Sequence, residues 1–234
     1  MQAKSHSDDH EHILFDAALE VFEPAYFEPD YWVTHGSLER VGAGRGRCWF
    51  VDGELGAWVL RHYRRGGKAA LLSADRYVYL GLARTRAFRE WHLLCDLVNQ
   101  GLPAPAPVAA RVRVDGPTYR AALITRTIAD TQTLAECLST DVNLTPILGE
   151  VGRCIRQFHD AGVWHADLNA HNVLVDSAGK AYLIDFDRSK RRAGQSWKHQ
   201  NLSRLRRSLD KLSTAHASEP FSSATWQTLL DAYS

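Results

Sequence analysis

A polar loop set between apolar segments, at residues 163–187, limits the folds open to this chain. The letters VWHADLNAHNVLVD and KAYLIDFD are typical of two short strands joined by a Ser-Ala-Gly turn. Just before them a long amphipathic helix is predicted from Pro146 to Gly162, with Thr145 and Pro146 as its start signals. A helix, a strand, a polar loop and a hairpin that ends in a carboxylate therefore follow one another in this order.

Three side chains with oxygen atoms stand out in this segment. Asn172 follows Asp167 by five residues, and Asp185 follows Asn172 by thirteen. HADLNAHN and IDFD, with this spacing, resemble the catalytic loop and the magnesium-binding turn of protein kinases and their small-molecule relatives. The resemblance implies that Asp167 orients the acceptor hydroxyl and receives its proton, and that Asn172 and Asp185 hold Mg²⁺ on ATP. Each residue alone also fits a loop cap or a strand-end ion pair; together, in this element order, they favour the kinase interpretation.

The resemblance extends to the fold class. We expect an α+β, two-lobed protein-kinase-like fold with a mainly antiparallel β N-lobe and a reduced, mainly helical C-lobe. A length of 234 residues suits one such domain better than two independent ones. The predicted division places a nucleotide-binding lobe at 1–127 and a catalytic lobe at 128–234. Residues 1–12, which are polar and rich in histidine, are expected to be a flexible tail.

Hydrophobic periodicity predicts the remaining elements. The first is a β-meander from Tyr31 to about residue 65. Helices are expected at 71–82 and around 88–98, and a hairpin turns at Asp115 and Gly116. Further helices are expected at 134–138 and at the carboxyl end, where the leucines of one helix form a buried edge: Leu202, Leu205, Leu209 and Leu212.

The amino-terminal half offers candidate nucleotide contacts. Gly42, Gly44 and Gly46 lie on a strand-to-strand turn, where backbone N–H groups can approach phosphates. Their GxGxG spacing is one residue tighter than the usual kinase loop, and a plain hairpin explains the glycines equally well.

Arg61 occupies the strand position where the kinase family keeps a phosphate-pairing lysine, with Lys68 as an alternative. Its expected partner is Glu90, on the apolar face of the 88–98 helix, because a buried carboxylate needs a cation. Glu90 at the rim, bridged to Arg86 or Arg89, is the alternative.

The segments RHYRRGG, HADLNAHN, DFDRSK and NLSRLRRSL together resemble the 3-deoxy-D-manno-octulosonic acid (Kdo) kinases of Gram-negative lipopolysaccharide synthesis. That resemblance implies transfer of the ATP γ-phosphate to the 4-hydroxyl of a Kdo residue on a lipid A precursor. Only about 47 residues follow IDFD, which leaves little chain to hold a peptide, so a protein substrate is not expected.

An anionic glycolipid acceptor would favour a cationic rim. Since the net charge is only +1, attraction to an anion depends on local clusters. The same clusters suit an anionic membrane surface, and they lack the interleaved aromatic residues of a nucleic-acid site. A solvated basic face explains any one of these residues equally well. The candidates are Arg64, Arg65, Arg188, Lys190, Arg204 and Arg207.

Four widely spaced cysteines, and the lack of a signal peptide or membrane-spanning run, predict a cytoplasmic protein with reduced thiols. The basic clusters and the resemblance to Kdo kinases imply a peripheral position on the inner membrane. Two alternatives stay open. One is another kinase of the same fold, for a heptose, aminoglycoside or choline-like acceptor. The other is a non-catalytic kinase-like module, which the intact Asp167, Asn172 and Asp185 disfavour. His165 is expected to organise the loop by hydrogen bonds.

Overall fold

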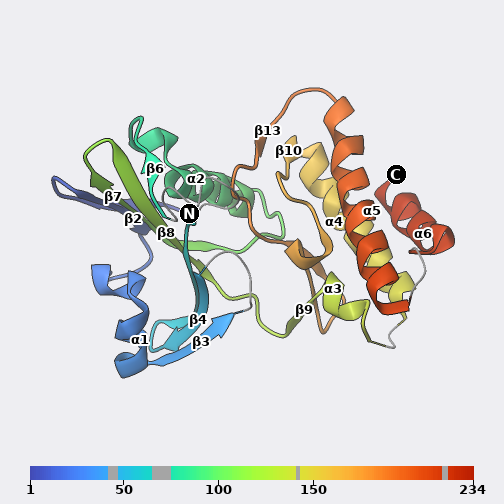
Figure 1. Ribbon diagram of the computed structural model, residues 1–234, viewed down its shortest axis with the longest axis horizontal. Helices are drawn as coiled ribbons and strands as arrows, with labels where there is room; N and C mark the ends of the chain where they lie inside the picture. Colours follow the sequence, from blue (N-terminus) through green and yellow to red (C-terminus); the bar gives the residue numbers. More distant parts are fainter. Residues whose placement is uncertain (42–46, 65–74, 141–142, 218–220) are drawn as a thin grey trace. The chain divides into compact units, whose positions relative to one another are not determined.

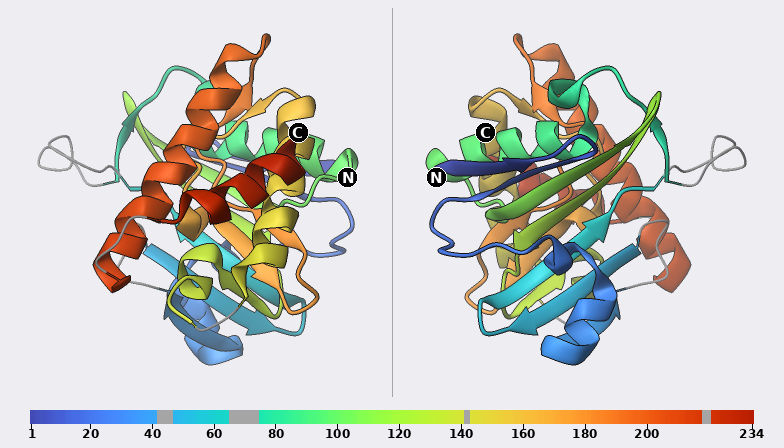
Figure 2. Two further views of the ribbon diagram at one scale, coloured as in Figure 1. Left: turned by 90° about the vertical axis from the view of Figure 1, so that its right-hand side faces the viewer. Right: turned by 90° about the vertical axis from the view of Figure 1, so that its left-hand side faces the viewer.

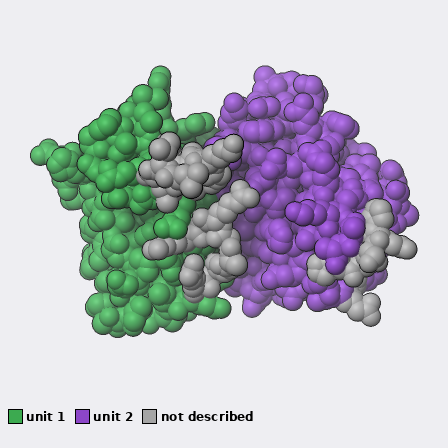
Figure 3. Space-filling model, in the orientation of Figure 1, with its two compact units in different colours: residues 1–99, 105–127 green, residues 100–104, 128–234 purple. Residues whose placement is uncertain are grey.

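The computed structural model describes residues 1–41, 47–64, 75–140, 143–217 and 221–234 (Figure 1). The chain is α+β and divides into two compact units, coloured separately in Figure 3. Unit 1 comprises Met1–Asn99 and Pro105–Thr127; unit 2 comprises Gln100–Ala104 and Ile128–Ser234. Residues 100–104 were predicted to belong to the amino-terminal, nucleotide-binding lobe. They belong instead to unit 2, where the Leu183 N–H donates to the Pro103 carbonyl at 3.0 Å.

Unit 1 is built on an antiparallel sheet. Along it the strands follow the order β1-β2-β7-β8-β5-β4-β3, and β6 also pairs with β8. Their bounds are β1 Ala3–Ser7, β2 Glu11–Asp16, β3 Ser37–Val41, β4 Arg47–Gly53, β5 Gly56–His62, β6 Tyr77–Val78, β7 Pro107–Asp115 and β8 Thr118–Arg126. The predicted hairpin around Asp115 and Gly116 is confirmed as β7 and β8.

The flexible tail predicted for residues 1–12 is wrong. β1 and β2 form a hairpin, and β2 pairs along β7, so this end of the chain extends the sheet (Figure 2). Ile13 anchors the hairpin, with 1% of its surface exposed. The polar residues of β1 are all exposed, which suits an edge strand.

Two further element predictions fail in unit 1. The strand expected from Tyr31 is a helix, α1 Pro29–His35, because Pro29 at its first turn and Asp30 favour a helix start. The helix expected at 71–82 is replaced, within its described part, by β6 and the short 3₁₀ helix η3 Leu82–Arg84. Residues 71–74 lie outside the described residues.

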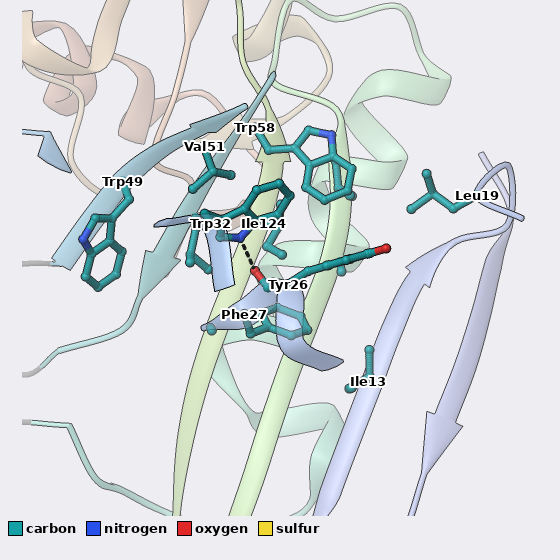
Figure 4. Close-up of a cluster of buried hydrophobic side chains, with 13 residues drawn as sticks. Ile13, Leu19, Tyr26, Phe27, Trp32, Trp49, Val51, Trp58 and Ile124 are labelled. Carbon is teal, nitrogen blue, oxygen red and sulfur yellow. Dashed lines mark hydrogen bonds between the residues drawn. The ribbon is translucent and has the colours of Figure 1, made fainter. Parts of the chain in front are cut away.

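Aromatic side chains fill the core of unit 1 (Figure 4). Trp32 of α1, Phe27 of the 3₁₀ helix η1 Pro24–Phe27 and Trp58 of β5 are almost completely buried. The Trp32 Nε1–H donates to the Tyr26 carbonyl at 3.0 Å, which ties α1 to η1. The helix predicted around 88–98 is confirmed as α2 Arg86–Asn99, packed against β7 and β8.

Unit 2 combines helices with short strand pairs. The predicted long helix and the following hairpin are confirmed as α4 and as β11 with β12. Its elements are β9 Thr131–Thr133, α3 Leu134–Cys137, α4 Leu144–Asp160, β10 Val163–Trp164, η4 Ala170–Asn172, β11 Val173–Asp176, β12 Ala181–Leu183, β13 Lys190–Arg191, α5 Ser196–Ala217 and α6 Ser223–Tyr233.

Helix α6 lies against α4 (Figure 2). Gly152 permits the contact, since a Cβ there would meet the Leu229 carbonyl oxygen at 2.3 Å. On α5, Leu202, Leu205 and Leu209 are buried, as predicted. Leu212, which was also predicted to be buried, is only partly buried. Within the described ranges, no helix combines the length and apolar character needed to cross a bilayer.

Candidate active site

The hairpin of β11 and β12 brings two of the predicted site residues to one end of a small sheet. Val173 pairs with Leu183, so Asn172 and Ile184 lie just beyond the last strand pair. The Ile184 N–H donates to the Asn172 carbonyl at 3.1 Å, and Asp185 is the next residue. Asp185 has a φ of 61°, a left-handed conformation that is uncommon outside glycine and often found at functional sites.

Asn172 also contacts the backbone of Asp167. Its Nδ2 donates to the Asp167 carbonyl at 2.9 Å, and the Nδ2 of Asn169 donates to the same oxygen at 3.0 Å. Because Nδ2 is a donor in this bond, the Oδ1 atom of Asn172 is the part of the amide suited to bind a cation. One side-chain and one backbone hydrogen bond of Asn172 therefore link Asp167 and the residue before Asp185 within unit 2.

His165 stabilises this loop from inside. Its side chain is buried; Nε2 contacts the Ile184 carbonyl at 2.9 Å, and Nδ1 accepts from the Asp167 N–H at 3.2 Å. Because Nδ1 accepts a hydrogen bond and Nε2 faces a carbonyl oxygen, the ring is neutral with its proton on Nε2, and burial lowers the pKa of His165. The predicted role of His165 as a loop organiser is confirmed.

Helix α5 supplies a support that the sequence analysis missed. Asn201 is 2% exposed; its Oδ1 accepts from the His165 N–H at 3.1 Å, and its Nδ2 donates to the His165 carbonyl at 2.7 Å. The Oγ of Ser208, on the same face of α5, accepts from the Ala170 N–H at 3.1 Å. The available signal was an amide one turn from Leu205, on the apolar side of the helix, where a polar group needs a partner.

Arg204 contacts the predicted catalytic carboxylate. Its Nε donates to Asp167 Oδ1 at 2.9 Å, and its Nη2 contacts the same oxygen. Both side chains are almost half exposed, 48% for Arg204 and 44% for Asp167. Arg204 was predicted to touch the substrate, and the structure places it on Asp167.

An open pocket of about 480 Å³ adjoins this pair within unit 2. Arg204 belongs to its lining, as does Arg207, another predicted substrate-binding residue. The pocket is formed by residues of β10, the loop at 165–169 and α5: Trp164, Ala166, His199, Gln200, Asn201, Ser203, Arg204 and Arg207.

The ion pair predicted in unit 1 is present. Arg61 Nη2 lies 2.5 Å from Glu90 Oε1, and the Tyr63 hydroxyl donates to Glu90 Oε2 at 2.5 Å. The Glu90 side chain is 3% exposed and the Arg61 side chain 21%. Strand β5 and helix α2 thus present a guanidinium that is fixed by a buried carboxylate.

The other predicted residues fall into two groups. Arg64, Arg188 and Lys190 are at least partly exposed, and Lys190 begins β13. The second group lies outside the described residues: Gly42, Gly44, Gly46, Arg65 and the alternative Lys68.

Hydrogen bonds join the loop that carries Asp167 to Asn172 and to the strand end before Asp185, and an α+β chain with this order of residues is typical of a phosphotransferase of the kinase class. Comparison with known proteins agrees. The model of the lipopolysaccharide kinase (Kdo/WaaP) family matches residues 29–233, so the chain belongs to this family. Membership makes the protein a phosphotransferase, and a kinase family implies a nucleotide substrate.

Relatives of this chain include proteins named 3-deoxy-D-manno-octulosonic acid kinase. The one from Photobacterium profundum is 40% identical over 226 residues, 96% of this chain and 95% of the relative. That from Stenotrophomonas maltophilia is 46% identical, over 86% of this chain and 80% of the relative. The Vibrio cholerae relative is 38% identical, over 88% of each.

Proposed function

We propose that this protein transfers the γ-phosphate of ATP to the 4-hydroxyl of a Kdo residue on a Kdo–lipid A precursor. The reaction would belong to lipopolysaccharide inner-core synthesis. The relatives named Kdo kinases, which match nearly the whole chain, support the acceptor. The observation that carries the chemistry is the hydrogen-bonded link between Asp167, Asn172 and the Ile184–Asp185 backbone.

Asp167 is the proposed catalytic residue. Its carboxylate orients the acceptor hydroxyl and accepts its proton while the acceptor oxygen bonds to the γ-phosphorus. The bond from that phosphorus to the oxygen bridging to the β-phosphate breaks, and ADP leaves. His165, Asn169 and Asn172 hold the backbone of Asp167 on both sides.

Asn172 and Asp185 are the proposed magnesium ligands. An amide oxygen and a carboxylate suit a hard cation, and the hairpin brings the two residues to the same end. When bound, Mg²⁺ would neutralise charge on the phosphates. The left-handed backbone of Asp185 supports a functional role for its orientation.

The remaining nucleotide contacts are proposed for unit 1. Arg61, fixed by Glu90, would bind phosphate through its forked guanidinium. The glycines Gly42, Gly44 and Gly46 would contribute backbone N–H groups. In this proposal unit 1 is the nucleotide-binding lobe and unit 2 the catalytic lobe of a two-lobed protein-kinase-like fold.

Exposed basic side chains support binding of the protein to an anionic membrane surface. Arg64, Arg188 and Lys190 are at least partly exposed and could approach the phosphates of lipid A or an anionic lipid surface. We therefore propose a peripheral position on the cytoplasmic face of the inner membrane, and expect neither a nucleic-acid partner nor a protein substrate.

The acceptor assay tests this function. Purified protein is incubated with Mg-ATP and a Kdo-bearing lipid A precursor, and mass spectrometry should detect one added phosphate, which NMR should locate on the 4-hydroxyl. A heptose-bearing lipid and an aminoglycoside serve as parallel acceptors. Phosphorylation of one of these, with the Kdo lipid unchanged, would establish another small-molecule kinase instead.

The metal role has a separate test. Asp185→Ala should weaken binding of Mg-ATP, measured by calorimetry, while binding of ATP in EDTA stays as in the wild type. Equal Mg-ATP affinity in the variant and the wild type would remove Asp185 from the metal site.

A further inference from the structure

The open pocket in unit 2 has the chemistry of an anion site beside the catalytic loop. Its α5 residues recur at helical spacing, from His199 through Ser203 and Arg204 to Arg207, and Trp164 of β10 completes it. We propose that this pocket binds the acceptor sugar through its carboxylate. The inference rests on the proposed function and assigns its acceptor site.

Charge in the pocket favours a carboxylate. Arg204 and Arg207 both line it, and none of its described lining residues is acidic. A guanidinium binds a carboxylate with two parallel hydrogen bonds, which fixes orientation as well as position. A volume of about 480 Å³ suits a sugar-sized group.

Trp164 gives the pocket an aromatic wall. The guanidinium of Arg192 lies over its ring, 4.0 Å from the ring centroid, and fixes the indole from one side. The indole lines the pocket, where an aromatic ring can pack against the C–H groups of a sugar. The pocket thus pairs an apolar wall with cations, as a sugar acid requires.

Arg204 connects the pocket to catalysis. It lines the pocket while two of its nitrogens contact the same oxygen, Asp167 Oδ1. An ion pair as exposed as this one contributes at most about 1 kcal/mol, so a carboxylate in the pocket can compete for Arg204. Once Arg204 turns to the substrate, Asp167 Oδ1 can accept the hydroxyl proton. Arg204 is therefore a positioning residue, and the acceptor carboxylate determines specificity.

The test compares two acceptors: the Kdo lipid and its analogue with the Kdo carboxylate converted to a neutral carboxamide. The wild type should prefer the carboxylate about 10- to 100-fold in kcat/KM, as expected for charge-assisted hydrogen bonds. Arg207→Ala should raise KM for the Kdo lipid by a similar factor, leave KM for ATP unchanged and reduce this preference. Arg207→Lys should restore part of it. Lys211→Ala, on the same helix outside the pocket lining, is the matched control and should behave as the wild type.

Two outcomes would overturn the pocket assignment while the function stands. In one, Arg207→Ala phosphorylates the Kdo lipid with unchanged KM. In the other, the variant loses activity equally on both acceptors, which indicates a merely structural role. If the wild type phosphorylates neither acceptor, the proposed function fails, and calorimetry with Kdo monosaccharide decides the pocket separately. Binding that Arg207→Ala abolishes would support the pocket, and no binding to the wild type would overturn it.

Discussion

The two units each contain an arginine–carboxylate pair, and the two pairs differ in burial. In unit 1 the Glu90 side chain is 3% exposed beneath Arg61, and in unit 2 Asp167 and Arg204 are 44% and 48% exposed. A buried pair is costly to break, because an unpaired charge remains in a low dielectric. An exposed pair exchanges partners at little cost. Arg61 therefore has a fixed orientation, whereas Asp167 can exchange Arg204 for another partner.

The buried polar groups beneath the catalytic loop of unit 2 are uncharged. His159 is 2% exposed, with Nδ1 2.8 Å from the Tyr233 hydroxyl and Nε2 3.3 Å from Asn201 Oδ1. Asn201 in turn bonds both backbone groups of His165. Neutral hydrogen bonds thus connect the carboxyl-terminal helix to the loop, whose charged Asp167 faces solvent.

The largest effect is expected on breaking the buried pair. Arg61→Ala removes the guanidinium 2.5 Å from the buried Glu90 and should lower the free energy of unfolding by about 3–5 kcal/mol. Urea denaturation followed by circular dichroism measures it. The double variant Arg61→Leu/Glu90→Leu has no orphaned charge and should recover much of the loss. A single variant as stable as the wild type would contradict the assigned role of the pair.

Lowering the pH should weaken the hydrogen bonds of the buried His159 with Tyr233 and Asn201 in unit 2. Burial lowers the pKa of His159 from 6.5 to about 4, so between these values the unfolded chain binds a proton that the folded chain does not. This contribution to stability is present above the unfolded pKa and is lost as the pH falls, by about 3 kcal/mol in all.

The network can be tested with His159→Gln, which keeps a side chain able to hydrogen-bond Tyr233 and Asn201. Unfolding free energies are measured from about pH 7 to about pH 4. The variant should lose less stability over this range than the wild type. Parallel curves for the two proteins would show that His159 does not titrate between the folded and unfolded states as the structure implies.

The smallest change in stability is expected at the exposed pair. Arg204→Ala should alter the free energy of unfolding by less than about 1 kcal/mol, because solvent screens both charges. Urea denaturation under the conditions used for Arg61→Ala provides the direct comparison. A loss as large as that of Arg61→Ala would mean that the two pairs are equivalent after all.

Hydrophobic periodicity predicted the helices and strands whose apolar residues recur at regular spacing. The long helix before the loop, now α4, and the hairpin of β7 and β8 are examples. Two segments show why the prediction could be wrong, one because its residues are polar and one because its residues favour strands. The polar residues 3–7 suggested a tail, yet pairing with β2 satisfies their backbone. Tyr31, Trp32 and Val33 favour strands, and Pro29 at the first turn outweighed them.

In the candidate site, the residues that lie within one short sequence motif could be predicted. The residues that reach this motif from a distant helix could not. Asp167, Asn172 and Asp185 lie on one loop and one hairpin, so their spacing along the chain was enough to assign them to one candidate site. Hydrogen bonds of Asn172 to the Asp167 carbonyl and to the Ile184 N–H join these segments. Asn201 reaches the loop from α5, and Arg204 bonds Asp167 across 37 residues of sequence. No local pattern encodes those distances, although the buried amide on an apolar helix face was a usable signal.

The most direct test of the account measures rate and stability on the same preparations of wild type and Asp167→Asn. The amide keeps the shape of the side chain but cannot accept the proton, so turnover on the Kdo lipid should fall about 10²- to 10⁴-fold. The free energy of unfolding should stay within about 1 kcal/mol, because the pair with Arg204 is exposed. A variant that turns over at the wild-type rate would contradict the catalytic role of Asp167.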